Sequence, residues 1–346
     1  MGEKKLNYAA SGVDIAEGDR AVERIKKLAK STFNESVLSE IGSFGGLFKP
    51  DLKGFNEPVL ISSADGVGTK LKIAFITGKH DTVGEDLVNH CVNDILVHGA
   101  RPIFFMDYIG TGKVKQDTIA EIIEGFSRGC KNHNMALLGG EMAELPDFYH
   151  PGEYDLAGFI VGILDRQKII NGADIKSGNV LIGLASNGLH TNGYTLARKI
   201  FFERAGLKAE DNVDTLGMTA GDALLKVHKS YYHLIQRLMD RFIIKGMAHI
   251  TGGGLKGNLV RILPDDVDAI IDKKSWPVLP IFKFLAEKGP VDEDDMFEAF
   301  NMGIGYVLAV CNEEAESVMS EVKKQGETSY IIGKIETGTG NVILKD

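Results

Sequence analysis

The chain has few cysteines, no long apolar run and no basic excess, and each shortage removes a class of protein. Its three cysteines, Cys91, Cys130 and Cys311, lie far apart with no CxxC pair. A disulfide framework and a cysteine zinc site are therefore not expected. No apolar run approaches the roughly 18 residues of a membrane helix, and "MGEKKLNYAA" lacks the apolar core of a signal peptide. We expect a cytoplasmic protein.

The charge and several missing motifs narrow the function further. A net charge of −9 argues against a general nucleic-acid binder, because such proteins need a basic surface to replace the counterions of phosphates. The sequence contains no GxSxG, no HExxH, no Walker A motif and no GxGxxG after a strand. Hydrolase and redox functions are therefore less well supported than other enzyme classes.

The pattern of apolar residues predicts mixed α and β structure in both halves of the 346-residue chain. Strands are expected at 102–109, 135–138, 179–185, 268–272, 306–310 and 330–335, and helices at 18–30, 117–131 and 193–203. A polar stretch with the turn signals Asn171-Gly172 and Ser177-Gly178 suggests a domain boundary. We predict an α+β chain with domains 1–167 and 168–346.

Glycine is abundant and clustered, and one cluster, "DGVGTK" (65–70), directly follows the apolar run 58–61. A glycine turn after a strand lets backbone N–H groups approach an anion. In that interpretation Lys70 supplies charge for a phosphate, Thr69 a hydroxyl contact and Asp65 a ligand for magnesium. The motif alone is equally compatible with a β-turn that Asp65 caps.

The next segment, 83–99, predicts a helix with one apolar and one polar side at about 100° per residue. The apolar side holds Leu87, Val88, Cys91, Val92 and Ile95, and the polar side holds Asp86, Asn89, His90, Asn93 and Asp94. Carboxylate and amide oxygens suit Mg²⁺. An ordinary polar face is the alternative.

Two further carboxylates stand at the ends of strand-like runs, Asp107 in "IFFMDYI" and Glu141 after "LLGG". A buried charge is costly unless it is paired or holds a metal. Either residue could instead cap a helix or pair with an arginine.

The second half offers two more polar clusters. "SNGLHTNGY" (186–194) places His190 in a glycine-rich loop before a helix, where a histidine can transfer protons or bind a substrate oxygen. A lone histidine is, however, more often structural. "HITGGG" (249–254) precedes another expected helix, whose N-terminus would suit an anion. One half could thus hold a nucleotide and the other a phosphorylated substrate.

Taken in order, these motifs resemble the phosphoribosylformylglycinamidine cyclo-ligase (aminoimidazole ribonucleotide synthetase) family of purine biosynthesis. The resemblance runs nearly end to end through "GVDI" (12–15), "GSFGG" (42–46), "DGVGTK", "LLGGEMAELP" (137–146), "SNGLHTNGYTL" (186–196), "HITGGG" and "FNMGIG" (300–305). "DGVGTK" recurs in related ATP-binding proteins such as selenophosphate synthetase and thiamine-monophosphate kinase. "GGExAExP" followed by "HTNGY" is specific to the cyclo-ligase.

The resemblance implies an ATP-dependent ligase that forms a C–N bond. It would close formylglycinamidine ribonucleotide to aminoimidazole ribonucleotide, with ADP and phosphate as the other products, through an iminophosphate. It also implies a homodimer whose N-terminal sheets join across the subunits, so that the ATP site lies near the interface. ATP and Mg²⁺ are the expected cofactors, and no nucleic-acid or membrane partner is expected.

The same resemblance assigns residues to roles. The nucleotide is expected at Gly45, Gly46, Asp65, Gly66, Gly68, Thr69, Lys70, Asn93 and Gly140. Magnesium is expected at Asp65, Asp94 and Glu141, catalysis at His190, Asp94 and Lys26, and the substrate at Asn192, Thr251, Gly252, Gly253 and Gly254.

The chain departs from the family pattern in two places. Val227 and His228 stand where many members have Pro-Thr, and Met142 stands where threonine is common. The nearest alternatives on the same scaffold are selenophosphate synthetase, thiamine-monophosphate kinase and the synthetase domain of formylglycinamidine synthase. A nucleotide-binding maturation protein is the alternative from a different class. The reactive N-terminal motif, glutaminase domain and C-terminal cysteine tail that would favour these alternatives do not occur in the sequence.

Overall fold

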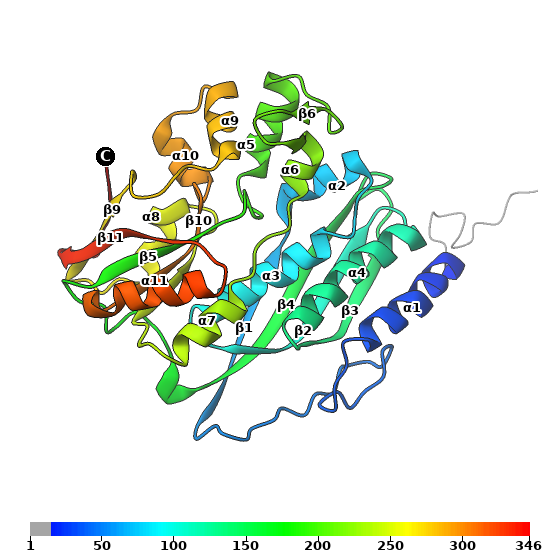
Figure 1. Cartoon of the computed structure of the whole chain (residues 1–346). Coiled ribbons are helices and arrows are strands. Elements are labelled where there is room, and N and C mark those ends of the chain that lie inside the picture. The colour runs from blue at the N-terminus through cyan, green and yellow to red at the C-terminus, as the bar shows by residue number, and fades with distance from the viewer. Residues whose placement is uncertain (1–14) are drawn as a thin grey trace, which may run out of the picture.

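Two β-sheets, one in each half of the chain, organise the fold (Figure 1). The computed structural model describes residues 15–346, so residues 12–14 of the "GVDI" motif lie outside the described residues. Both halves combine helices with a sheet, and the predicted two-domain α+β fold is confirmed. The predicted boundary between residues 167 and 168 falls in the 3-10 helix η3 (Arg166–Lys168), after the last strand of the first sheet.

The first sheet has four strands in the order β1-β4-β2-β3. Their bounds are β1 (Pro58–Gly66), β2 (Arg101–Thr111), β3 (Ala136–Glu144) and β4 (Tyr154–Asp165). Strands β2 and β3 are parallel and are joined by helix α4 (Gln116–Asn132), since a parallel pair needs a crossover connection. Helix α3 (Val83–Leu96) packs on the strands beside α4, and α1 (Ile15–Lys30) packs on α4. Between β1 and α3 lie the 3-10 turn η2 (Gly68–Lys70) and α2 (Leu71–Thr77).

The second sheet has six strands in the order β12-β9-β11-β5-β10-β8, all antiparallel except the pair β12 and β9. Its strands are β5 (Val180–Ala185), β8 (Gly246–His249), β9 (Val267–Asp272), β10 (Ile304–Val310), β11 (Ser329–Thr337) and β12 (Val342–Lys345), and β6 (Asn212–Val213) pairs separately with β7 (Met218–Thr219). Every residue of β10 is buried, so this strand lies at the centre of the second core.

Short helices surround the second sheet. They are α5 (Tyr194–Arg198), the π-helical turn η4 (Lys199–Arg204), α6 (Ala220–Leu225), α7 (Tyr232–Met239), α8 (Gly254–Leu259), η5 (Val260–Ile262), α9 (Pro280–Lys288), α10 (Glu293–Ala299), η6 (Asn312–Glu314) and α11 (Ala315–Lys324). The helix predicted at 193–203 is thus a short α-helix that widens into a π-helical turn. None of the helices within residues 15–346 combines the length and apolarity needed to cross a bilayer.

The polar side of α3 is not exposed to solvent, because it packs against the second half of the chain. Asn89 Nδ2 donates to the carbonyl oxygen of His228 at 2.7 Å. Asn93 Nδ2 donates to the carbonyl oxygen of Lys229 at 2.8 Å, and Asn93 Oδ1 accepts from the Tyr231 N–H at 3.0 Å. Most of this side therefore joins the two halves. From the sequence, this side could have been a magnesium site or an ordinary polar face. In the structure, most of it is a contact between the domains.

The open face of the first sheet shows the reverse arrangement. Side chains alternate between the two faces of a strand, and on the face away from α3 and α4 several large apolar side chains are exposed. Leu60 on β1 is 63% exposed, Phe159 on β4 46% and Met106 on β2 38%. Phe159 and Met106 are direct partners in the pairing of β4 with β2. This apolar surface, Leu60, Met106 and Phe159, is called the open sheet face below.

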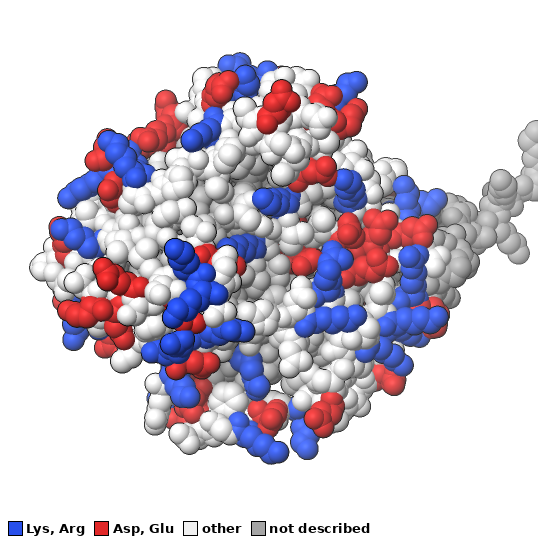
Figure 2. Space-filling model, viewed as in Figure 1, with Lys and Arg blue, Asp and Glu red and all other residues white. Residues whose placement is uncertain are grey.

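Charged side chains are mixed on the face of the molecule seen in Figure 2, where basic and acidic groups stand next to one another over most of the surface. An interspersed pattern of this kind weakens any strong field of one sign. On the view shown, the described residues therefore present no continuous basic surface.

Candidate active site

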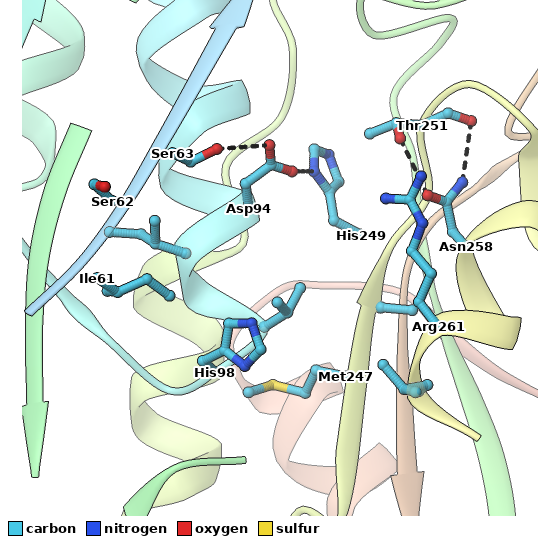
Figure 3. Close-up of a pocket in the computed structure, with 14 residues that line it drawn as sticks. Ile61, Ser62, Ser63, Asp94, His98, Met247, His249, Thr251, Asn258 and Arg261 are labelled. Atoms are coloured by element: carbon cyan, nitrogen blue, oxygen red, sulfur yellow. Dashed lines mark hydrogen bonds and ion pairs between the residues drawn. The ribbon is translucent and has the colours of Figure 1, made fainter. Parts of the chain in front are cut away.

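A cavity of about 340 Å³ lies between the two halves of the chain (Figure 3). Polar side chains from both halves line it: Ser63, Asp94, His249, Thr251, Asn258 and Arg261. Ser63 comes from β1, two residues before "DGVGTK", and His249 ends β8 at the start of "HITGGG". The cavity therefore lies between the strand that leads into "DGVGTK" and the start of "HITGGG".

Asp94 stands in the wall of this cavity near the end of α3. Its Oδ1 accepts a hydrogen bond from His249 Nδ1 at 2.8 Å, and its Oδ2 lies 3.5 Å from Ser63 Oγ (Figure 3). Burial raises the pKa of Asp94, but the hydrogen bond from His249 and the charges of His249 and His90 together outweigh burial and hold the pKa below its ordinary value. Asp94 is thus an ionised carboxylate at neutral pH.

A continuous chain of hydrogen-bonding side chains connects "DGVGTK" with the cavity. In order, it runs through Asp65, His90, Thr191, His228, His249 and Asp94. The successive contacts measure 2.7, 2.7, 3.2, 3.1 and 2.8 Å. His90 comes from α3, whereas His228 and His249 belong to the second half, so the chain crosses the domain boundary.

The contacts restrict where the protons of this chain lie. Carboxylates only accept, so His90 Nε2 and His249 Nδ1 carry the protons that face Asp65 and Asp94. His228 Nε2 lies 3.1 Å from His249 Nε2 and 3.2 Å from Asn93 Nδ2, an amide nitrogen that only donates. Burial lowers the pKa of His90, but Asp65 and Asp94 more than offset it and raise that pKa above its ordinary value. Burial also lowers the pKa of His249, and there the opposing effect of Asp94 is too small to offset it.

Lys70, predicted to bind a phosphate, has a different place in the structure. Its side chain is fully buried, and its Nζ donates to Asp86 Oδ1 at 2.8 Å, to the His190 carbonyl oxygen at 3.1 Å and to the Lys226 carbonyl oxygen at 2.7 Å. An ammonium group has three donors, and all three are used. Lys70 therefore forms a buried ion pair within the first half, joins the second half through two carbonyl oxygens, and has no donor left for a phosphate.

The other residues of "DGVGTK" remain accessible. Gly68 and Thr69 are exposed, and Thr69 Oγ1 lies 3.0 Å from Thr195 Oγ1 in the second half. Asp65 and Gly66 end strand β1, and Asp65 Oδ1 accepts from the neighbouring Gly66 N–H at 2.7 Å. Burial raises the pKa of Asp65, but His90 and the Gly66 N–H bring it below its ordinary value. The turn η2 that follows begins without a side-chain cap, and its glycine end faces solvent.

His190, predicted to be catalytic, is only 1% exposed and does not line the cavity. Its ring stacks on that of His228 with 4.2 Å between centroids, and neither ring nitrogen has a hydrogen-bond partner. Burial holds its pKa well below the ordinary value. A Cβ on Gly305 would come within 2.5 Å of His190 Cε1, so the chain makes room for this ring with a glycine. The placement corresponds to the structural alternative.

The predicted substrate residues lie together beside the cavity. Thr251 Oγ1 donates to Asn258 Oδ1 at 3.2 Å, and Asn258 Nδ2 donates to the Gly254 carbonyl oxygen at 2.8 Å, so the Asn258 side chain braces the loop 251–254. Gly254 has a φ of +59°, and a Cβ there would lie 1.8 Å from the Phe297 carbonyl oxygen. Only glycine fits. The neighbouring Asn192 has a buried Nδ2 without a partner in the structure.

The predicted nucleotide and metal residues separate into two groups at opposite edges of the first sheet. Asp65 pairs with Gly158, Gly158 with Asp107 and Asp107 with Gly140. Because neighbouring strands lie about 4.8 Å apart, Asp65 and Gly140 are separated by roughly 14 Å. Glu141, the residue after Gly140, therefore cannot bind the same ion as Asp65 within one chain, and the predicted set of three magnesium ligands is corrected accordingly.

Lys26 and the glycine loop belong to the β3 edge. A Cβ on Gly42 would lie 3.8 Å from Lys26 Cε, and a Cβ on Gly46 would lie 2.4 Å from Leu138 Cγ on β3. Gly45 and Gly46 are exposed there, beside the same strand that carries Gly140 and Glu141. Asn93, also predicted at the nucleotide, is instead fully buried in the domain contact.

The donor atoms near Asp94 do not form a preformed magnesium site. Among residues 22–346, two clusters could hold a metal ion, His190 with His228 and His249, and His90 with Asp94 and His249. Both are rich in nitrogen, whereas Mg²⁺ prefers oxygen ligands in octahedral geometry. The oxygens of Asp65 and Asp94 already accept hydrogen bonds from protein N–H groups.

Several cavity residues, among them Asn258, were not predicted from the sequence. His249 opens the "HITGGG" motif, of which only Thr251 and the glycines were assigned a role. Ser63 lies between the apolar run 58–61 and "DGVGTK", and no role was assigned to it. Arg261 follows α8, and nothing in the sequence distinguished it from a surface arginine.

Comparisons with known proteins identify the family. Residues 54–164 match "AIR synthase related protein, N-terminal domain", and residues 176–345 match "AIR synthase related protein, C-terminal domain". The phosphoribosylformylglycinamidine cyclo-ligase of Alkaliphilus oremlandii is 51% identical over 340 residues, which cover 98% of this chain and 100% of that protein. The enzyme of the same name from Thermodesulfovibrio yellowstonii is 50% identical over 333 residues, covering 96% and 97%.

Solved structures show the same fold at much lower identity. The thiamine-monophosphate kinase of Stenotrophomonas maltophilia superposes with a TM-score of 0.69 at 17% identity, covering 94% of this chain and 96% of the kinase. The hydrogenase maturation protein HypE in complex with ATP gives a TM-score of 0.67 at 16% identity, covering 96% and 92%. These structures show the fold alone, whereas the relatives above show that the chain belongs to the phosphoribosylformylglycinamidine cyclo-ligase family.

Proposed function

We propose that the chain closes the ring of formylglycinamidine ribonucleotide with ATP, giving aminoimidazole ribonucleotide, ADP and phosphate. The observation that carries this proposal is the identity of about half of all residues with cyclo-ligases over nearly the whole chain. The cavity between the halves supports it, because it joins the strand of "DGVGTK" to the "HITGGG" loop. Three free cysteines fit the reducing cytoplasm in which we place the enzyme.

The chemistry requires activation of an amide. An amide oxygen is a poor leaving group, so the oxygen first attacks the γ-phosphorus of ATP, and ADP leaves. In the iminophosphate that results, an amidine nitrogen attacks the former amide carbon. Phosphate then departs with the oxygen, and a proton is lost from the nitrogen. The protein has mainly to position the reactants and to balance their charges.

The cavity residues can perform these tasks. Asp94 is ionised and held in orientation by His249, so it can form an ion pair with a positively charged amidine. The backbone N–H groups of the exposed turn at Gly68 and Thr69 are suited to phosphate oxygens. Lys70 and His190 serve by holding the two halves in register rather than by touching the reactants.

We propose that Mg²⁺ enters with ATP. Magnesium usually keeps several waters and binds through one or two carboxylates and the nucleotide phosphates, so the absence of a preformed cage around Asp65 and Asp94 is compatible with it. When bound, it would neutralise charge on the phosphates. None of the steps above depends on a magnesium ligand from the chain.

We also propose that the active form is a homodimer built on the open sheet face. Leu60, Met106 and Phe159 expose apolar side chains on three neighbouring strands, and burial of such a surface favours association. A symmetric partner would also explain why predicted nucleotide residues occupy two edges of the sheet. Lys26, Gly45, Gly46, Gly140 and Glu141 of one subunit would then complete the ATP site that Asp65 to Thr69 begin on the other.

Two assays test the proposal. The purified protein with ATP, Mg²⁺ and formylglycinamidine ribonucleotide should release one ADP per ring closed, and ADP release no higher than in a protein-free control would refute the activity. Lys26→Met and Asp65→Asn should each abolish turnover. When the two variants are unfolded and refolded together, a shared site restores roughly a quarter of wild-type activity, because half of the dimers each contain one intact site. No recovery would place both residues in one subunit's site.

A further inference from the structure

Arg261 is the single lysine or arginine among the residues that line the cavity. Its side chain is exposed, and no ion pair or hydrogen bond engages its guanidinium within the described residues. Arg128 and Arg241, in contrast, pair with Glu85 and Glu321. An arginine directed into a cavity without a carboxylate partner has five N–H donors free for an anion.

The local structure holds Arg261 in this place. It belongs to η5, which continues directly from α8, and it follows Asn258 by three residues, so that both side chains project on the same side. Asn258 is fixed by its bonds to Thr251 and Gly254. Figure 3 shows the guanidinium beside the side chains of Thr251 and Asn258. The backbone beneath Arg261 is thus anchored to the glycine loop.

The cavity has charges of both signs. Arg261 comes from η5 in the second half, whereas the ionised Asp94 comes from α3 in the first. The proposed substrate also carries both signs, because its ribose 5-phosphate is an anion and its amidine is a strong base that is protonated at neutral pH. A volume of about 340 Å³ lies within the range of small-ligand sites.

Resting on the proposed function, we propose that Arg261 binds the 5′-phosphate of the substrate and so sets its orientation, with the amidine directed toward Asp94. A guanidinium matches two phosphate oxygens at once and keeps its charge at any physiological pH. The hydroxyl group of Ser62, which also lines the cavity, offers a further donor. Arg261 is therefore the residue by which the site selects a phosphorylated ribose over a free one.

The first test is kinetic. Arg261→Met should raise the KM for formylglycinamidine ribonucleotide by about 10- to 100-fold, the equivalent of one lost charged hydrogen-bonding group. The KM for ATP should stay within about twofold of wild type, because Arg261 belongs to the substrate cavity. Arg261→Lys should recover part of the loss. The matched control is Lys256→Met, which removes one exposed charge from α8 at a different surface pocket and should leave both constants unchanged.

The second test does not depend on turnover. Calorimetry should detect ribose 5-phosphate binding to the wild type and to Lys256→Met, but not to Arg261→Met, and ribose should bind to none of them. If the wild type shows no ADP release with substrate, the proposed function fails, and calorimetry alone decides the phosphate site. If the wild type turns over and Arg261→Met keeps the wild-type substrate KM, the phosphate site is refuted. Should Arg261→Met not fold, Arg261→Lys replaces it in both measurements.

Discussion

The polar side of α3 and the open sheet face belong to the same domain but reverse the usual distribution of residues. On α3, Asp86, Asn89, His90 and Asn93 are at most 5% exposed. On the sheet, Phe159 and other large apolar side chains face solvent. Buried polar groups need partners, and exposed apolar groups mark a surface that something covers. The polar side finds its partners in the second half of the same chain, whereas nothing in the described part of the chain covers the open sheet face.

The difference separates two kinds of contact. Joining the halves through hydrogen bonds fixes one geometry, since each donor must meet its acceptor. An apolar face is less directional and suits association of subunits. The cavity lies beside the hydrogen bonds that join α3 to the second half, so these bonds set its shape. The ATP site, in contrast, is proposed to depend on the open sheet face.

The largest effect is expected from breaking the directional contact at Lys70. Lys70→Met leaves Asp86 as an unpaired charge in the interior and should lower the free energy of unfolding by about 3–5 kcal/mol, measured by urea titration. Burial raises the pKa of Asp86 although Lys70 opposes it, which shows how strongly the site resists a lone carboxylate.

Lys79, two residues after α2, provides a matched control for Lys70. Lys79 pairs with Asp222 of the second half at 2.5 Å, but both side chains are about half exposed. Lys79→Met should cost less than about 1 kcal/mol. Adding Asp86→Asn to Lys70→Met should recover part of the loss, because an amide oxygen still accepts from the His228 N–H, which lies 2.7 Å from Asp86 Oδ1. Equal losses for Lys70→Met and Lys79→Met would contradict the buried pair.

A smaller effect is expected on the apolar side. Phe159→Lys places a charge at the centre of the open sheet face and should raise the dimer dissociation constant by roughly 100-fold, or about 2.7 kcal/mol. Sedimentation velocity measures the monomer fraction. Ile243→Lys, at a residue that is 72% exposed in the second half, is the control and should leave the oligomeric state unchanged. A Phe159→Lys protein that remains as dimeric as the control would remove the open sheet face from the interface.

The sequence predicted the elements of this fold better than it predicted the site. Strands such as 179–185 and 306–310 follow from local apolar pattern, and the structure has them at β5 and β10. Local pattern also placed a helix over α3 with the correct two sides. The local pattern could not show which residues contact the polar side of α3, because the partners of Asn89 and Asn93, at His228 and Lys229, lie more than 130 residues away in the chain.

The site shows the same limit. "DGVGTK" was interpreted as a unit, but the fold sends Lys70 inward and leaves Gly68 and Thr69 outside. His228, noted as a departure from the family pattern, turned out to be fully buried and to connect Thr191 with His249. Met142 has no comparable role, and nothing in the structure explains its departure. Where a side chain serves the contact of two domains, only the three-dimensional arrangement can show it.

The smallest effect concerns a histidine of the domain contact that lacks a carboxylate. His133 Nδ1 donates to the Gly129 carbonyl oxygen at 2.6 Å, and its Nε2 lies 2.7 Å from Ser230 Oγ in the second half. Burial lowers the pKa of His133 to about 4. In the unfolded chain a histidine has a pKa near 6.5, so on acidification the unfolded state takes up a proton that the folded state refuses. The folded state is therefore destabilised as the pH falls from 7 toward 4.

Replacing this histidine should weaken the acid dependence of stability. Between pH 7 and pH 5 the difference amounts to about 2 kcal/mol, from 1.5 pH units at 1.36 kcal/mol each. Urea titrations of His133→Gln at the two pH values should show a loss of stability smaller than that of the wild type by this amount. His150→Gln, at an exposed histidine, is the matched control. An unchanged acid dependence in His133→Gln would mean that His133 takes up its proton in the folded protein as readily as in the unfolded chain, and that the polar domain contact tolerates a charge there.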